Sequence, residues 1–225
     1  MTDKAPPRAR TRLYLITPPQ IADMQAFGKS LKDALGAGDV ASLQLRLKGA
    51  DGMIDMQATR EVGLAVTEMA QEAGVAVLIN DSAELARELG ADGVHVGWDD
   101  MPVKAARTLL GPDAIVGATA KNSYHRAMQA GEDGADYVAF GAFYPTTTKE
   151  GTVPAEAELL TVWQAAMLIP CVAIGGITVA NAAPLVTAGA DFLAVSSGVW
   201  AHEEGPATAV RAFNQIFDQL AEAPR

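Results

Sequence analysis

Three near-copies of one phrase divide this chain: LGADGVHVG at 89–97, DGADYVAFG at 133–141 and AGADFLAVS at 188–196. In each copy a helix-like stretch ends at a glycine that can adopt the left-handed cap conformation, and a short apolar run of strand length follows. The three glycines, at positions 90, 134 and 189, are 44 and 55 residues apart, which leaves room for further strand–helix units. The phrase therefore predicts alternating strands and helices, with functional residues at the strand ends.

Eight apolar segments are predicted to be strands, at 13–17, 42–48, 75–80, 93–96, 114–118, 137–143, 172–175 and 192–196. Helical patterns separate them, at 52–73, 83–89, 103–110, 123–132, 155–168, 180–187 and 206–220. Continuously apolar strands indicate burial on both faces, and 225 residues allow roughly 28 for each of eight units. We expect an α/β fold, a single-domain TIM (β/α)8 barrel over residues 12–225, preceded by a flexible arm over residues 1–11.

Charge and composition argue against nucleic acids and membranes as partners of this protein. A net charge of -10 argues against a nucleic-acid surface, which needs many lysines and arginines. No segment is long and apolar enough to span a membrane, and residues 1–11 lack the apolar core of a signal peptide. The single cysteine, Cys171, is predicted to be a buried thiol. We expect a cytoplasmic protein. An open doubly wound sheet is the alternative fold, but its glycine-rich dinucleotide turn is missing.

Cations and carboxylates follow the early strands. Strand alternation places Gln44, Arg46 and Lys48 on one side of the second strand, where two cations at this spacing could hold a phosphate or pyrophosphate. Asp81 follows the third strand and Asp100 follows the fourth, so their carboxylates could converge on Mg²⁺. The alternatives are incidental charges at a solvated strand end and aspartates that cap helices.

Later strand ends offer groups suited to a second anion. The stretch YPTTTKEG at 144–151 combines hydroxyls, backbone amides and a lysine, although a plain turn uses the same residue types. Glycines follow the seventh strand, and two serines and a glycine follow the eighth, where barrels of this kind often bind phosphate. The chain is thus predicted to have two anion sites, one of them assisted by a metal.

Taken together, six segments resemble one family: QLRLK (44–48), LIND (78–81), GVHVGWDD (93–100), FGAFYPTTTK (140–149), VAIGGIT (172–178) and the GAD and SS of 189–197. They are similar to the thiamin phosphate synthases, in order, over roughly residues 13–217. The resemblance implies a transferase that joins hydroxymethylpyrimidine pyrophosphate to thiazole phosphate and releases pyrophosphate. It implies a dissociative, Mg²⁺-assisted mechanism that uses leaving-group electrostatics and positioning rather than a protein nucleophile.

The resemblance also implies a role for each matching residue. The leaving pyrophosphate would be bound by basic and polar side chains: Arg46, Lys48, Asn80, Thr119 and Lys149. Asp81 and Asp100 would hold Mg²⁺, and Gln44 and His95 would contact the pyrimidine, although a lone strand histidine is more often a core residue. The thiazole phosphate would be bound by Thr146, Thr148, Gly176, Ser196 and Ser197. The sequence leaves open whether the chain forms a homo-oligomer.

The chain departs from the family pattern at three positions. Trp98 stands where glutamine is usual, Leu47 where an acid is common, and Lys121 where the strand-five loop usually has a histidine. Two alternatives therefore stay open. A thiazole tautomerase would share the barrel but would be expected to use that histidine and to lack the paired acids and the PTxTK loop. A non-catalytic barrel that binds a phosphorylated ligand would fit the changes at Trp98 and Lys121.

Overall fold

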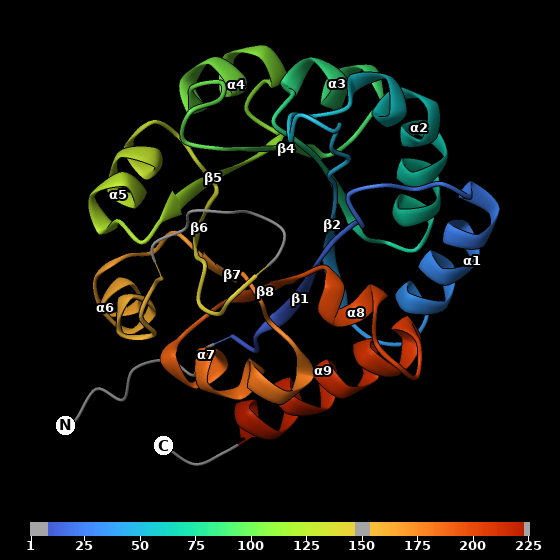
Figure 1. The fold of residues 1–225 in the computed structure, drawn as a ribbon. Coiled ribbons are helices and arrows are strands. Elements are labelled where there is room, and N and C mark those ends of the chain that lie inside the picture. Colours follow the sequence, from blue (N-terminus) through green and yellow to red (C-terminus); the bar gives the residue numbers. More distant parts are fainter. Residues whose placement is uncertain (1–8, 147–153, 223–225) are drawn as a thin grey trace.

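The computed structural model describes residues 9–146 and 154–222. Within these residues, eight parallel strands hydrogen-bond in chain order and close into a barrel, and helices surround it (Figure 1). The strands are β1 Arg12–Ile16, β2 Val40–Leu45, β3 Ala76–Asn80, β4 Gly93–Val96, β5 Ile115–Lys121, β6 Tyr137–Gly141, β7 Cys171–Ile174 and β8 Phe192–Val195. The predicted TIM barrel is confirmed.

The helices alternate with the strands. They are α1 Met24–Leu35, α2 Met56–Glu72, α3 Ala83–Glu88, α4 Val103–Leu110, α5 Tyr124–Glu132, α6 Glu158–Ala166, the 3-10 turn η1 Val179–Asn181, α7 Ala182–Ala188, α8 Ser197–Trp200 and α9 Pro206–Glu222. The larger core lies between this ring and the outer faces of the strands, and a smaller cluster fills the barrel interior. In the described residues no helix is both long enough and apolar enough to cross a bilayer.

The repeated GAD phrase has a structural purpose at the amino ends of the strands. Its aspartate accepts a hydrogen bond from a backbone N–H of the preceding strand: Asp92 from Val77 at 2.7 Å, Asp136 from Val116 at 2.7 Å, and Asp191 from Cys171 at 2.8 Å. In return, the backbone N–H of each aspartate donates to the carbonyl of the strand residue from which its side chain accepts. The phrase therefore links β3 to β4, β5 to β6 and β7 to β8, and we call each of these aspartate links a pin. Asp39 acts comparably between β1 and β2, where the Arg12 guanidinium donates to both of its carboxylate oxygens at 2.7 and 2.8 Å.

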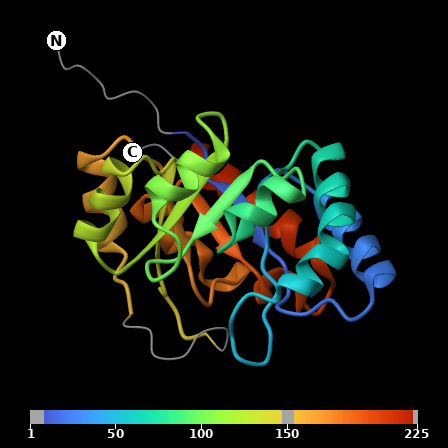
Figure 2. The ribbon, with the colours of Figure 1, turned by 90° about the horizontal axis from the view of Figure 1, so that it is seen from above.

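Several predicted boundaries were wrong. Strand β2 ends at Leu45 rather than at residue 48, because the chain turns outward there and Lys48 forms an antiparallel bridge to Ile54. Figure 2 shows this loop after β2 projecting from the end of the barrel. Helix α1 was not predicted, and β5 continues to Lys121. Cys171 is fully buried, as predicted.

The amino-terminal end of the described chain contacts the barrel. Residues 1–8 of the expected arm lie outside the described residues, whereas Thr11 is buried and donates to the carbonyl of Ala190 at 2.8 Å. The Arg10 guanidinium donates to Asp218 at 2.6 Å and to the side chain of Asn214 at 2.8 Å. The entry to β1 is thereby fixed to the last helix, α9.

Candidate functional site

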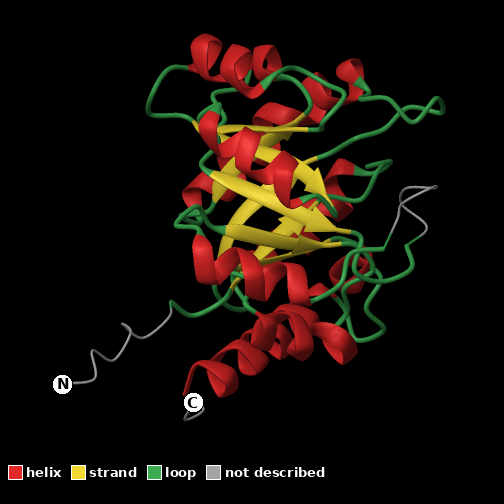
Figure 3. Ribbon diagram, turned by 90° about the vertical axis from the view of Figure 1, so that its left-hand side faces the viewer, coloured by secondary structure: helices red, strands yellow, loops and turns green. Residues whose placement is uncertain are grey.

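The strands all point toward one end of the barrel, where the longer loops gather (Figure 3). Lys48, which follows β2, donates a 2.8 Å hydrogen bond to Oδ2 of Asp81, and the side-chain amide of Asn80 donates to the same oxygen. Asp81 itself has φ of 62°, a left-handed conformation, and its backbone N–H bonds to the carbonyl of His95 in β4 at 2.8 Å. The backbone after β3 is thus turned so that the Asp81 carboxylate meets Lys48.

Asp81 and Asp100 lie beside one another at this end. The Asp100 carboxylate occupies the space that a Cβ at Gly97 would need, and Oδ1 of Asp81 is 3.9 Å from that Cβ position. Burial would raise the pKa of Asp81, but the hydrogen bond and charge of Lys48 outweigh it and the pKa is lowered. Partial burial and then the charge of Asp81 raise the pKa of Asp100. Two carboxylates this close repel, and a shared cation would relieve the repulsion.

This donor set fits a Mg²⁺ ion. The described residues contain no group of three or more histidine, cysteine, aspartate or glutamate side chains suited to a metal. Mg²⁺ commonly takes only one or two protein carboxylates and fills its other positions with water and substrate phosphate oxygens. Asp81 and Asp100, from the ends of adjacent strands, meet that requirement.

Arg46 lies half-buried next to this pair. Its backbone N–H donates to the hydroxyl of Thr17 at 2.9 Å, which ties the chain after β2 to the end of β1. Burial lowers the pKa of the guanidinium, partly offset by the charge of Asp81. In the described part of the chain no hydrogen bond or ion pair engages its side chain. Arg46 therefore supplies a fixed positive charge that a phosphate could take up.

A chain of hydrogen-bonded side chains crosses the barrel interior. Gln44 Nε2 donates to the Tyr14 hydroxyl at 2.8 Å, and the Tyr14 and Tyr137 hydroxyls are 2.9 Å apart. The Tyr137 hydroxyl is 2.8 Å from His95 Nδ1, and His95 Nε2 is 2.8 Å from the Thr119 hydroxyl. Burial raises the pKa of both tyrosines, so they stay neutral. These hydrogen bonds fix the orientation of Gln44 and His95, the two side chains predicted to contact the pyrimidine.

Gly117 leaves room in the barrel interior for this row of hydrogen-bonded side chains. A Cβ at Gly117 would overlap the ring of Tyr137, so only glycine at this point of β5 lets the tyrosine lie across the barrel. Sequence reasoning missed Tyr14, Tyr137 and Thr17. Tyr14 and Tyr137 lie within predicted strands, and a tyrosine in an apolar run gives no sign of whether its hydroxyl faces the barrel interior or the helices.

Three of the predicted phosphate-binding residues, Gly176, Ser196 and Ser197, lie after β7 and β8. Gly176 has φ of 64°, and a Cβ there would overlap the carbonyl of Pro145, so this turn packs directly on the segment that leads to Thr146. Ser196 donates its hydroxyl to the carbonyl of Thr17 at 3.1 Å, and Ser197 begins the short helix α8. Thr148 and Lys149 lie outside the described residues.

Two further residues connect these turns. The Tyr144 hydroxyl donates to the carbonyl of Asn181 at 2.7 Å, and the Asn181 side chain donates to the carbonyl of Gly176 at 3.0 Å. Sequence reasoning missed both. They hold the beginning of the loop after β6 against the loop after β7. This end of the barrel thus has two regions. One, after β2 to β4, combines a pair of carboxylates with positively charged side chains. The other, after β7 and β8, is made of glycines and serines.

Comparisons with known proteins agree on a single family. A family model described as "Thiamine monophosphate synthase" matches residues 13–199. A thiamine-phosphate synthase from Hyphomonas neptunium is 84% identical over 98% of this chain and 100% of its own length. One from Rhodospirillum centenum is 56% identical over 92% of this chain and 97% of its own. The solved thiamine phosphate pyrophosphorylase from Pyrococcus furiosus superposes with a TM-score of 0.79 at 29% identity, covering 94% of this chain and 97% of that one.

Proposed function

The chain belongs to the thiamine monophosphate synthase family and is a transferase, and from that premise we propose that it joins hydroxymethylpyrimidine pyrophosphate to thiazole phosphate, releasing pyrophosphate. The observation that carries the proposal is the acidic pair Asp81 and Asp100 with Lys48 bonded to one of them at 2.8 Å. The two carboxylates can bind a metal ion, and the lysine ammonium can bind the oxygens of a pyrophosphate held by that ion.

The residues around the acidic pair would act on the leaving group. Asp81 and Asp100 would hold Mg²⁺, which when bound neutralises charge on the pyrophosphate oxygens. Arg46 and Lys48, with Asn80, Thr119 and Lys149, would bind the same group. The bond from the pyrimidine methylene carbon to the pyrophosphate oxygen breaks with its electron pair on that oxygen. The thiazole nitrogen then donates its lone pair to the methylene carbon.

The barrel interior would bind the pyrimidine. Because one N–H of Gln44 Nε2 donates to Tyr14, the orientation of the amide is set, and its oxygen and second N–H are available to a ligand. His95 is held through both ring nitrogens, by Tyr137 and Thr119, so its ring orientation is set before substrate arrives. Positioning of this kind lowers the entropic cost of aligning the two reacting substrates.

The glycine and serine region would bind the phosphate of the thiazole partner. Gly176, Ser196 and Ser197 offer backbone amides and hydroxyls after β7 and β8, and Thr146, after β6, would add a further hydroxyl. Thr148, which lies outside the described residues, would bind the same phosphate. With the two anions bound at separate places on the barrel rim, the thiazole nitrogen can face the pyrimidine methylene carbon. In this arrangement no protein nucleophile takes part.

The two alternatives are weaker. A non-catalytic barrel does not agree with membership in a family of transferases. A tautomerase acting on the thiazole alone has no need of the Lys48–Asp81–Asp100 cluster, and Lys121 stands where that interpretation expects a histidine.

The direct test mixes the purified protein with both phosphorylated precursors and Mg²⁺ and follows thiamin phosphate and pyrophosphate by chromatography. We expect the two products in equal amounts, and none when either precursor or the metal is withheld. Binding of both precursors without product would overturn the proposal, as would conversion of the thiazole phosphate alone.

A further inference from the structure

The loop between β4 and α4, residues 97–102, carries Asp100 but has little of its own to hold it in place. Its one internal backbone bond runs from Asp100 N–H to the carbonyl of Gly97 at 3.3 Å, and Pro102 at the start of α4 makes no side-chain cap. Trp98 is 43% exposed, and the Asp99 side chain is 83% exposed. Met101, near the end of the loop, packs against the hydrophobic core, whereas residues 98–100 are exposed and would move more freely.

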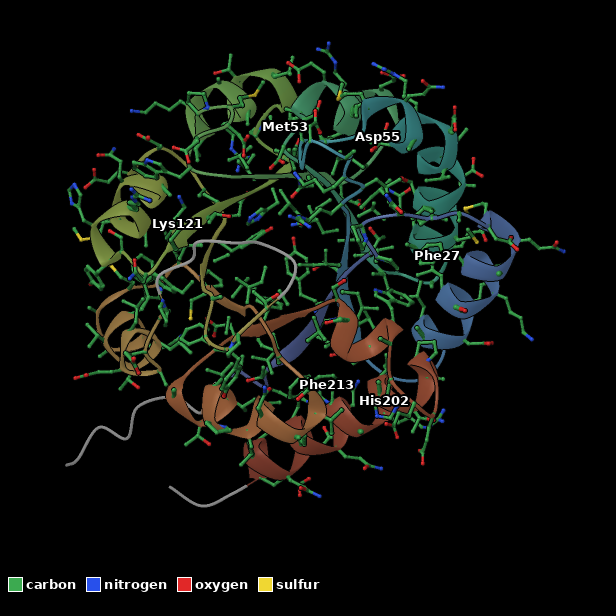
Figure 4. All side chains as sticks on the ribbon, viewed as in Figure 1. Phe27, Met53, Asp55, Lys121, His202 and Phe213 are labelled. Atoms are coloured by element: carbon green, nitrogen blue, oxygen red, sulfur yellow. The ribbon has the colours of Figure 1, made fainter. Side chains whose placement is uncertain are left out.

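Two side-chain contacts reach this loop from the next strand–helix unit. The guanidinium carbon of Arg126 lies 4.5 Å from the centre of the Trp98 ring, a close cation–π contact. Lys121 Nζ is 3.6 Å from Asp99 Oδ2. We name these four residues, Trp98, Asp99, Lys121 and Arg126, the clasp. Figure 4 shows Lys121, at the end of β5, beside α5, the helix that carries Arg126.

The side of the clasp that belongs to β5 and α5 is well fixed. Lys121 is the last residue of β5 and pairs with Phe140 of β6, after a register shift between Thr119 and Lys121. Its φ of 55° is a left-handed conformation that few side chains adopt, so the surrounding structure must hold it. Arg126 lies in the first turn of α5, which Ser123 caps by accepting from the Arg126 N–H at 3.3 Å. An irregular loop is thus attached to a strand end and a capped helix.

We propose that the clasp positions Asp100 beside Asp81, so that Trp98 and Arg126 are positioning residues for the metal site. The proposal rests on the proposed function, which assigns Mg²⁺ to these two aspartates. Trp98 and Lys121 are two of the three positions at which the sequence departs from the family pattern, and both belong to the clasp. In this chain they fasten the loop from its exposed side, away from the Lys48 contact that fixes Asp81.

A double-mutant cycle on the cation–π pair tests this proposal. We expect Trp98→Leu and Arg126→Gln each to raise the Mg²⁺ concentration for half-maximal turnover by about two- to fivefold, the range that loss of an exposed cation–π contact supports. The double variant should be no worse than either single one, because each removes the same contact. At saturating Mg²⁺ kcat should return to within about twofold of wild type.

The ion pair offers a second, weaker arm of the test. Lys121→Met and Asp99→Asn should each raise the same Mg²⁺ requirement by up to about fivefold at low salt, and high salt should remove the difference. Lys104→Met is the matched control, because it removes a 2.8 Å lysine–aspartate pair between α4 and the end of α5 without involving the loop. Two results would overturn the proposal. One is a Mg²⁺ requirement in the Trp98→Leu, Arg126→Gln double variant that rises by the product of the two single effects. The other is a fall in kcat at saturating Mg²⁺ as large as the fall at limiting Mg²⁺.

A measurement without substrate or metal keeps this proposal separate from the proposed function. Amide hydrogen exchange within 98–101 should be severalfold faster in Arg126→Gln than in wild type or Lys104→Met, while exchange in the strands is unchanged. Unchanged exchange in the loop would overturn the clasp even if the protein makes thiamin phosphate. Faster exchange in a protein that makes no thiamin phosphate would overturn the proposed function and leave the mechanical role of the clasp standing.

Discussion

At the scale of single residues, Asp81 and Asp100 share a site but differ in what their loss should do. We expect Asp81→Asn and Asp100→Asn both to abolish turnover at limiting Mg²⁺, since either change removes a metal-binding carboxylate. Asp100 is exposed, so its replacement should change the free energy of unfolding by within about 0.5 kcal/mol. Asp81→Asn should cost more, because it leaves Lys48, only 16% exposed, without its charge partner.

Magnesium titrations of turnover and urea unfolding check both statements. Asp113→Asn, an exposed aspartate away from the site, serves as the control. Wild-type turnover in either variant at limiting metal would contradict the assignment.

Arg46 and Lys48 should distinguish the two anion sites. We expect Arg46→Ala and Lys48→Ala to weaken binding of the pyrimidine pyrophosphate about ten- to a hundredfold, since a hydrogen bond to a charged group contributes about 1.5–3 kcal/mol. Thiazole phosphate, bound at the other side of the rim, should lose little. Isothermal titration with each ligand measures the difference. Equal losses for the two ligands would show that the sites are wrongly assigned.

The sequence could predict which side chains meet where they directly follow adjacent strands. Asp81 and Asp100 were predicted from adjacent strand ends, and the structure brings them together. Tyr14 and Tyr137 show the limit. The direction of a side chain from a doubly buried strand depends on barrel register and on space elsewhere, here the missing Cβ of Gly117, and neither is visible in a local pattern.

At the scale of the element, the repeated aspartates should contribute stability rather than activity. We expect Asp136→Ala to lower the free energy of unfolding by about 1.5–3 kcal/mol, because a backbone N–H of β5 loses its charged acceptor and Arg107 loses its ion pair. Asp133→Ala, in the same copy of the phrase, loses an ion pair with the exposed Lys104 but leaves no strand N–H without its acceptor, so it should cost less. Thermal unfolding compares the two. A similar cost for both would show that the pin adds nothing.

The boundaries of elements were harder to predict than their order. The eight strands follow from apolar runs and the GAD phrase, whereas β2 was drawn too long because its alternation of leucine with polar residues continues to Lys48. The actual end depends on a tertiary bond from Lys48 N–H to the carbonyl of Pro19. Helix α1 begins at a cap by Asp23, a signal that was overlooked.

At the scale of the whole molecule, the pin between β1 and β2 should make stability depend on pH. The Arg12 hydrogen bonds to Asp39 hold the pKa of that carboxyl below its usual value. A group whose pKa is depressed by folding stabilises the protein above its unfolded pKa of about 3.9, and the contribution is lost as pH falls through the folded value.

Comparison with Asp39→Asn isolates this contribution. The variant should be less stable than wild type by up to about 1 kcal/mol at pH 7, because the pair is partly exposed. The difference should be smaller at pH 3 than at pH 7, because pH 3 lies below the unfolded pKa. Urea unfolding at both pH values measures it, and a difference that grows on acidification would contradict the assignment.

The four pins also divide the barrel into four quarters of two strands each. Each quarter closes its own pair of strands, and Arg10 bonded to Asp218 at 2.6 Å brings the two ends of the described chain together. A circular permutant that joins those ends by a short linker and opens the chain between β4 and β5 would break no pin. One opened between β5 and β6 would sever the chain inside a quarter. The first should fold like the parent and the second less stably, so the modular unit of this barrel is two strands long.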